Sequence, residues 1–267
     1  MKMKQVSNNQ KKYLYNYKKR KYIIQFSRIM LLLLFLLLWE YTADHNIIDS
    51  FIFSSPSQIA LCFWQMVMDK SILCHIGITL YETVFSFLIV TLIGLLIATI
   101  LWFSQILSSI IEPYLVVLNS LPKSALAPLL IVWLGASHTT IIAAGISVAV
   151  FGNILNLYTS FKCVDPGKIK LIYTLQGTKL QALLKVVLPS SIPAIISNMK
   201  VNIGLCLVGV IIGEFLAAKS GLGYLIIYSS QVFKMDWLLM SIVLLCIMAM
   251  GLYSLINILE KWCKKRY

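Results

Sequence analysis

The sequence has 267 residues, of which 59% are hydrophobic and only 12% are charged, and its mean hydropathy is +0.85. Because a soluble domain carries about 25% charged residues, this composition excludes an ordinary water-soluble protein and predicts one that crosses the lipid bilayer. The formal net charge of +13 could suggest nucleic-acid binding. The Lys and Arg residues are instead clustered as in membrane topology signals, so we expect no nucleic-acid partner.

Residues 1–21 form a basic tail, and the first apolar segment follows at 22–41. The basic part is too long for a secretory signal peptide, and no small-residue cleavage pattern follows the apolar part. We therefore predict a retained membrane anchor.

The stretch Asp44–Glu82 is too polar to cross a membrane and is expected outside it. Ser55, Pro56 and Ser57 begin a predicted helix that continues to Met68, and its apolar residues suit the membrane surface or packing against the helix bundle. Cys62 and Cys74 lie in this stretch. They are either two apolar thiols or a disulfide.

A helix of about 20 apolar residues crosses the hydrocarbon core, and six segments approach that length. The predicted spans are 22–41, 83–103, 113–135, 139–161, 194–218 and 237–258. Of the 23 Lys and Arg residues, nine lie in 1–28, five in the loop 162–193 and four after residue 260. Six spans place these clusters on one side, so both termini and the loop are predicted to be cytoplasmic.

The third span contains Pro122, Lys123 and Pro128, where a lipid-facing helix would be uniformly apolar. Each proline removes a backbone hydrogen bond, so we predict a kinked or broken helix in the protein interior. Lys123 is expected to face a cavity or a backbone carbonyl group. A transport-path role and a structural role both stay open.

Other polar residues inside the spans are judged by their depth. Lys200 is expected to extend its ammonium group back to the cytoplasmic face. Glu214 lies at the opposite interface, about 15 Å beyond Lys123 on straight-helix geometry, so a direct pair between these two is not expected. The residues proposed to line a translocation path are Asn119, Pro122, Lys123, Asn153 and Glu214.

The loop 162–193 shows two short amphipathic helices. Asp165 is a good N-cap, Pro166 suits the first helical position, Gly177 interrupts the pattern and Thr178 can cap the second helix. The second helix is expected to end at Pro189. Its apolar face either lies on the bilayer or the bundle, or docks a soluble partner.

Several stretches in order resemble the permease subunits of bacterial ABC importers. They are Ser54–Ser57, Leu121–Leu129, Trp133–Gly135, Val187–Pro193, Gly213–Ala218 and Gly221–Ile226. Within that family the resemblance is closest to the branch that serves sulfonates, taurine, nitrate and thiamine or pyrimidine precursors. It extends from about Ser54 to Ile226.

The resemblance implies an all-α type I importer permease, with the permease domain at 22–267 and cytoplasmic termini. It also implies a second permease copy, two ATP-binding subunits and an extracytoplasmic substrate-binding protein. In the family, the cytoplasmic loop docks on the ATPase. Carried onto this sequence, the docking residues are Lys170, Tyr173, Gln176, Gly177, Thr178, Leu180, Leu183, Leu184, Leu188 and Pro189.

This copy of the family's loop motif departs from the usual pattern. Lys170 stands where the family has Glu, Leu171 and Ile172 stand where it has two Ala, and Gln176 stands where it has Gly. Gly177 follows one position late. Bulky residues thus replace small ones that would permit close approach to a partner.

The sequence predicts no catalysis and no cofactor or metal in this chain. It contains no phosphate-binding GxxxxGK[ST] loop, so any ATP hydrolysis belongs to a partner. His45, His75 and His138 are scattered, and we interpret them as lone histidines. The alternatives are a stand-alone secondary transporter or channel and, third, an intramembrane enzyme.

Overall fold

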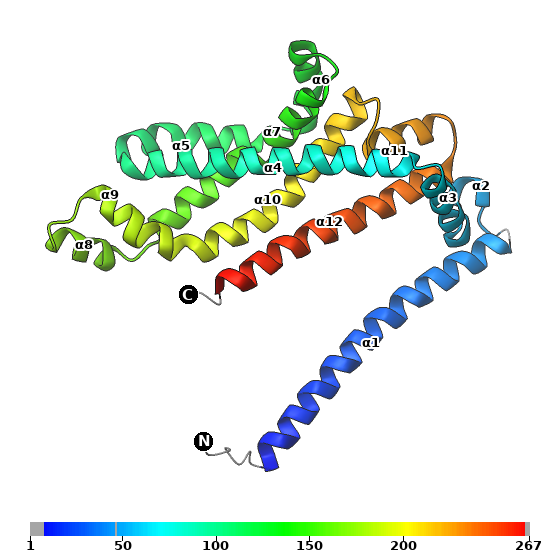
Figure 1. Cartoon of the computed structure of the whole chain (residues 1–267), viewed down its shortest axis with the longest axis horizontal. Coiled ribbons are helices and arrows are strands. Elements are labelled where there is room, and N and C mark those ends of the chain that lie inside the picture. The colour runs from blue at the N-terminus through cyan, green and yellow to red at the C-terminus, as the bar shows by residue number, and fades with distance from the viewer. Residues whose placement is uncertain (1–7, 46, 265–267) are drawn as a thin grey trace. The chain divides into compact units, whose positions relative to one another are not determined.

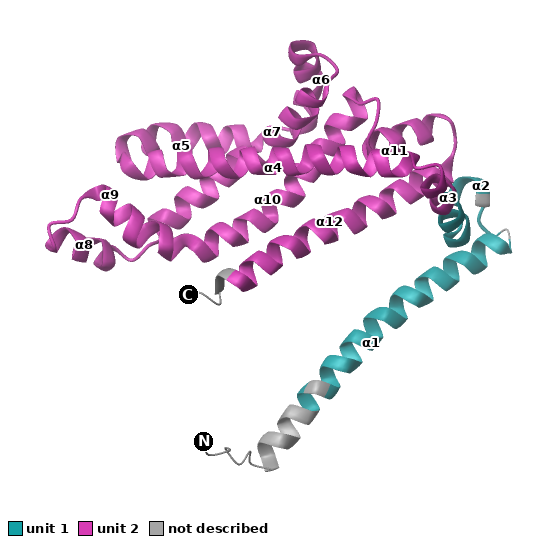
Figure 2. Cartoon of the chain, in the orientation of Figure 1, with its two compact units in different colours: residues 1–62 teal, residues 63–267 magenta. Residues whose placement is uncertain are grey.

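The computed structural model describes residues 8–45 and 47–264, and these residues form helices and connecting turns without a β-strand (Figure 1). They divide into two compact units, residues 1–62 and 63–267 (Figure 2). The first unit holds α1 (Asn8–Asp44), α2 (Ser50–Phe53) and the start of α3 (Pro56–Met68). The second holds the remaining helices.

Helix α1 is 37 residues long, about 55 Å at 1.5 Å per residue, which exceeds the thickness of the hydrocarbon core. It runs from the basic tail through the predicted first span without a break, so no structural boundary lies at residue 21. Near its end, the Glu40 carboxylate accepts hydrogen bonds from Ser57 N (3.0 Å) and Ser57 Oγ (2.6 Å). A carboxylate at the start of α3 is favourable because the first N–H groups of a helix lack internal partners.

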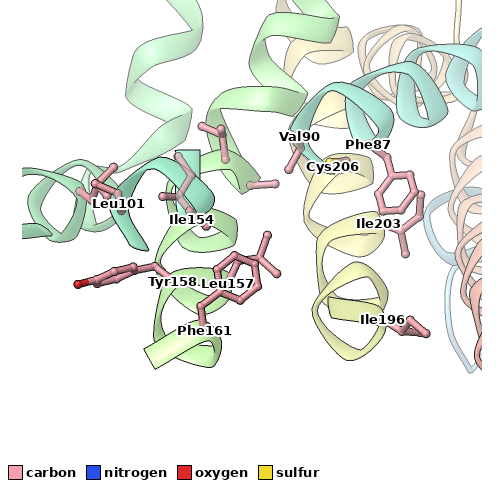
Figure 3. Close-up of a cluster of buried hydrophobic side chains, with 14 of the residues drawn as sticks. Phe87, Val90, Leu101, Ile154, Leu157, Tyr158, Phe161, Ile196, Ile203 and Cys206 are labelled. Carbon is pink, nitrogen blue, oxygen red and sulfur yellow. The ribbon is translucent and has the colours of Figure 1, made fainter. Parts of the chain in front are cut away.

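The core of the second unit is built from α4 (Ser71–Phe103), α7 (His138–Lys162) and α10 (Leu188–Ala217), with α4 and α10 each packed along α7. Figure 3 shows buried side chains from all three helices, including Val90, Phe161 and Cys206. Glycines permit this packing: a Cβ on Gly209 would lie 2.8 Å from Gly145 Cα. Small residues at helix contacts are typical of membrane bundles.

Five helical segments are long and apolar enough to cross a membrane: Lys19–Asp44, Ser71–Phe103, His138–Lys162, Lys179–Ala217 and Met235–Trp262. The last belongs to α12 (Met235–Lys264), which packs against α10 and α11 (Leu222–Gln231). The pair α5 (Gln105–Ser120) and α6 (Lys123–Leu134) makes a sixth if it counts as one broken span. The all-α fold predicted from the sequence is confirmed.

The predicted break in the third span is present. Helices α5 and α6 meet at 94°, and Leu121 and Pro122 between them have extended backbones. Lys123 Nζ donates to the carbonyl oxygens of Leu118 (3.0 Å) and Asn119. Lys123 was expected to face either a cavity or a backbone carbonyl group, and it bonds to backbone carbonyl groups. These oxygens lie at the end of α5, where the helix leaves its last acceptors without internal partners.

Two predicted boundaries differ from the structure. The helix expected to begin at Thr83 begins at Ser71, so Glu82 lies within α4, where it is fully buried. The helix expected to end at Pro189 does not end there, because α9 (Lys179–Ala182) continues through the π-helical turn η1 (Leu183–Val187) into α10. Leu188 N donates to Leu183 O five residues back, and this wider turn accommodates a proline that has no N–H.

Candidate functional site

The loop 162–193 is ordered mainly by hydrogen bonds between near neighbours, and Lys179 Nζ also donates to Phe103 O at the end of α4 (2.7 Å). Asp165 Oδ1 accepts from Gly167 N (2.8 Å) at the start of α8 (Pro166–Thr174), as the sequence predicts. Thr178 and Gln181 form a reciprocal capping box at the start of α9. Thr178 N donates to Gln181 Oε1 (2.9 Å), and Gln181 N donates to Thr178 Oγ1 (3.3 Å).

Between these helices the chain turns at Gln176, not at Gly177. Gln176 has a φ of 57°, in the left-handed region that favours glycine, and it occupies the position where the family motif has Gly. Gly177 N donates to Ile172 O (2.8 Å), and a Cβ on Gly177 would lie 2.8 Å from that oxygen. Both positions are therefore restricted, Gln176 by its dihedral angle and Gly177 by space.

The loop exposes large apolar side chains, which we call the loop surface. Its members are Leu171, Tyr173, Leu175, Leu180 and Leu184, between 45% and 71% exposed. Lys170, Gln176 and Thr178 are exposed beside them, and Pro189 is half-buried. Two predicted docking residues face inward instead: Leu183 is 3% exposed in the core, and Leu188 packs against the same core.

Leu171 and Leu175 belong to the loop surface, although the predicted docking set omits them. The periodicity of α8 carried the needed signal, since Leu171 and Leu175 are four residues apart and share a face. Leu183 and Leu184 are adjacent, and only the packing of η1 into the core, beside α9 and α10, decides which one is buried. Leu183 is therefore not part of the loop surface.

The residues proposed for a translocation path do not gather in one place. Asn119 and Pro122 are exposed at the α5–α6 break, and Lys123 lies half-buried beside them. Asn153 and Glu214 are each 1% exposed and lie in helix contacts. In this chain alone, the last two therefore line no open path.

Asn153 is the centre of a buried amide network between α4, α7 and α10. Its Nδ2 donates to Val90 O (2.6 Å), and its Oδ1 accepts from Asn198 Nδ2 (2.6 Å) and Asn202 Nδ2 (2.7 Å). A Cβ on Gly94 would overlap the Asn153 amide, so this glycine makes room for the network. Satisfied amides of this kind hold membrane helices together.

At the end of the bundle where α10 finishes, side chains from α4 and α10 cap the first turn of α11. Gly221 N donates to His75 Nδ1 (3.0 Å), Leu222 N to Thr79 Oγ1 (2.8 Å) and Gly223 N to Glu214 Oε2 (2.5 Å). These three consecutive N–H groups would otherwise have no partner. We call this group of side chains, with Glu82 and His138, the Glu82–Glu214 cluster.

The positions of the two glycines that follow Glu214, Gly221 and Gly223, are explained by this geometry. Gly221 has a φ of 117°, and a Cβ there would collide with the Glu214 carboxyl group. A Cβ on Gly223 would lie 2.7 Å from Glu214 Oε2. Both glycines are needed because the carboxylate occupies the space beside the turn.

Glu82 and His138 join the same cluster, and the sequence did not reveal either role. His138 Nδ1 lies 2.7 Å from Glu82 Oε1, so His138 is not a lone histidine. His75 is likewise part of the cluster. The sequence did contain one indication of the cluster: His75, Thr79 and Glu82 are polar residues spaced four and three apart, so they share one face of α4.

Two further predictions concern side-chain partners. Lys200 has side-chain partners on α12: its Nζ donates to Asn257 Oδ1 (3.1 Å) and pairs with the Glu260 carboxylate. Cys74 is a free thiol, so the disulfide with Cys62 that the sequence left open is not formed.

Known proteins resemble this chain in sequence and in fold. Residues 90–267 match the family described as the binding-protein-dependent transport system inner membrane component. A probable ABC transporter permease protein of Haemophilus influenzae is 28% identical over 229 residues, covering 83% of this chain and 90% of that protein. A putative aliphatic sulfonates transport permease protein of Bacillus subtilis is 24% identical, covering 84% of this chain and 81% of that protein.

A formylaminopyrimidine transport permease protein of Halalkalibacterium halodurans is 26% identical over 192 residues, covering 72% of this chain and 76% of that protein. Among solved structures, an amino acid ABC transporter superimposes with a TM-score of 0.60 at 17% identity, covering 74% of this chain and 97% of that one. Because the family match spans two thirds of the sequence and the fold agrees, the chain belongs to the inner membrane components of binding-protein-dependent transport systems, the permeases of ABC importers.

Proposed function

We propose that two copies of this chain form the membrane path of an ATP-driven importer for a small anion or vitamin precursor, such as a sulfonate, taurine, nitrate or a thiamine or pyrimidine precursor. Two separate ATP-binding subunits would dock on the loop surfaces, and an extracytoplasmic binding protein would deliver the substrate. The substrate class is supported by the names of the relatives, which include sulfonate and formylaminopyrimidine permeases.

The loop surface is the observation that carries this proposal. It combines locally capped helices with five exposed apolar side chains. A helix face of this kind suits insertion into an apolar groove of a soluble partner. Closure of the ATPases on ATP would then move the loops and rock the two permease halves between inward and outward openings.

The proposed orientation places the loop, the N-terminus and the C-terminus in the cytoplasm. It rests on the three basic clusters, which six spans bring to one side of the membrane. The loop would then face the compartment that contains ATP, as the docking proposal requires.

Docking can be tested with aspartate substitutions on exposed and buried leucines. The double variant Leu180→Asp/Leu184→Asp should remain in the membrane and fold normally, but it should lose co-purification of the ATPase encoded beside it and lose uptake. Phe233→Asp provides the control, since Phe233 is 64% exposed at the other end of the bundle. Unchanged co-purification and uptake in the double variant would contradict the proposal.

Membrane vesicles that contain the wild-type chain distinguish this proposal from the alternative, a stand-alone secondary transporter or channel. A secondary transporter or channel would move substrate in vesicles without ATP and without an ATPase. Uptake of radiolabelled taurine, an alkanesulfonate, nitrate and a pyrimidine precursor, each with its binding protein, would identify the substrate class. Transport that persists after ATP depletion would favour the alternative.

A further inference from the structure

A cavity lies where the loop 162–193 leaves the helix bundle, between the last turns of α4 and α7 and the first turns of α5 and α8. Its volume is about 390 Å³, within the range of roughly 300–1,000 Å³ that is typical of ligand sites. Leu101, Tyr158 and Phe161, which belong to the buried core, form part of its wall (Figure 3). The polar part of the wall includes Gln105, Ser109, Glu112 and Lys162.

The wall carries one acidic and one basic side chain that do not neutralise each other. Glu112 is half-buried on α5, and Lys162 is exposed at the end of α7. Within residues 8–45 and 47–264, neither side chain forms an ion pair. Lys162 Nζ instead lies 5.1 Å from the centroid of the Tyr158 ring. An occupant that carries both a cationic and an anionic group would complement this wall, because each charge would then gain a charge-assisted hydrogen bond.

The neighbouring charged side chains already have partners. Lys179 Nζ donates to Phe103 O (2.7 Å) and lies 5.7 Å from the centroid of the Trp102 ring. The Asp165 carboxylate accepts from Gly167 N at the start of α8. Glu112 and Lys162 are therefore the charges that an occupant of the cavity would meet.

The cavity lies at the depth of the lipid headgroups. Helices α4 and α7 are long and apolar enough to cross a membrane, and they end at Phe103 and Lys162, beside the cavity. Trp102 and Tyr158 line it, and these two residue types are enriched at the interface between membrane and water.

Apolar side chains beside the cavity leave room for acyl chains. Ile100 on α4 and Ile106 and Ile110 on α5 are neighbours of lining residues in the chain, and they are 53%, 77% and 57% exposed. A lipid can place its headgroup in the polar cavity and its acyl chains along these side chains. A water-soluble zwitterion would leave the apolar surface uncovered.

We propose that the cavity binds the headgroup of a phospholipid that has a primary ammonium group, such as phosphatidylethanolamine. Glu112 accepts hydrogen bonds from the ammonium group, and Lys162 pairs with the phosphate. Phosphatidylcholine is a poorer match because its quaternary ammonium group has no N–H to donate. An anionic lipid suits a purely basic pocket, whereas here it would bring no cation to Glu112.

The bound lipid contacts α4, α5, α7 and the first turn of α8, so it fixes the base of the loop against the bundle. This property belongs to the single chain. It does not depend on which substrate is transported or on which ATPase docks.

The test offers the purified full-length chain, in detergent, equal amounts of phosphatidylethanolamine, phosphatidylcholine and phosphatidylglycerol with the same acyl chains. Native mass spectrometry measures the bound lipid. The wild type should bind phosphatidylethanolamine about 5- to 10-fold more tightly than phosphatidylcholine. Equal binding of these two lipids would overturn the proposal.

Variants assign the two charges to the two parts of the headgroup. Glu112→Gln should lose the preference for phosphatidylethanolamine without binding phosphatidylglycerol more weakly. Lys162→Met should weaken the binding of all three lipids, because each has a phosphate. Asp69→Asn and Lys185→Met are the controls, since both residues are exposed and neither lines the cavity. An unchanged preference in Glu112→Gln would contradict the assignment.

Two measurements on the wild type need no variant to fold. In nanodiscs, a photoactivatable phosphatidylethanolamine should label peptides from 100–112 or 158–169, and labelling confined to other peptides would overturn the site. Soluble phosphoethanolamine, the headgroup without acyl chains, should leave the melting temperature in detergent unchanged at a concentration where the lipid raises it. Equal stabilisation by both would assign the cavity to a free zwitterion and overturn the lipid proposal.

Discussion

The two ends of the α7–α10 helix pair differ in how they are stabilised and in what they expose. At the loop 162–193, most hydrogen bonds join residues two to five positions apart, with Lys179 Nζ to Phe103 O (2.7 Å) as a long-range exception, and large apolar side chains stay exposed. At the Glu82–Glu214 cluster, partners are separated by as many as 146 residues, and most of the polar groups are buried. Because the loop is held largely by its own hydrogen bonds, its folding does not depend on the apolar side chains that it exposes. The cluster, by contrast, holds separate helices together.

The largest effect on stability is expected from Glu214→Ala. The change removes acceptors for Gly223 N and Thr79 Oγ1 and leaves Glu82 beside a cavity, which should cost about 3–5 kcal/mol of unfolding free energy. Thermal unfolding in detergent would measure the loss. Leu216→Ala is the control, since Leu216 lies in the same turn but is 52% exposed, and an equal loss in both variants would contradict the buried role of Glu214.

A smaller loss is expected from Asn153→Ala, in the bundle core between the two ends. Three hydrogen bonds to α4 and α10 disappear, and at the strengths measured in membrane proteins these sum to about 2 kcal/mol. The measurement is the same melting curve, with Asn119→Ala as the control at an exposed asparagine. Equal melting temperatures for Asn153→Ala and the wild type would show that the network contributes nothing.

Lys123→Met should lower the unfolding free energy by about 1 kcal/mol, because the cation no longer bonds the last carbonyl groups of α5. Methionine keeps the length of the side chain, so the comparison isolates the charge and its donors. Lys219→Met, at an exposed lysine, should be neutral. If Lys123→Met abolishes uptake while the melting temperature is unchanged, the residue has a transport role instead.

The smallest effect is a gain, expected at the loop. Gln176→Gly relieves the left-handed backbone at φ 57°, which should stabilise the chain by about 0.5–1 kcal/mol after the extra flexibility of glycine is counted. Gln181→Gly should do the reverse, because it removes the capping box. A lower melting temperature for Gln176→Gly would mean that its side chain makes a stabilising contact that outweighs the strain.

The comparison of the two ends also explains which features could be predicted. The caps at Asp165 and Thr178 and the break before Lys123 were predictable, because each depends on residues that are neighbours in the chain. The burial of Leu183 beside the exposed Leu184 was not. It depends on the π turn η1, which buries Leu183 and Val187 in the core and leads into α10.

The amino-acid sequence by itself determined the membrane class, the all-α fold, the approximate spans and the family motifs, since apolar length, periodicity and local capping are written in consecutive residues. Only the tertiary structure decided that Glu82, His138 and Glu214 share one site. Their partners are brought together by helix packing, and the sequence gives no distance between α4, α7 and α10. Burial then turns these scattered polar residues into a single network, because in the absence of water they can only bond to one another.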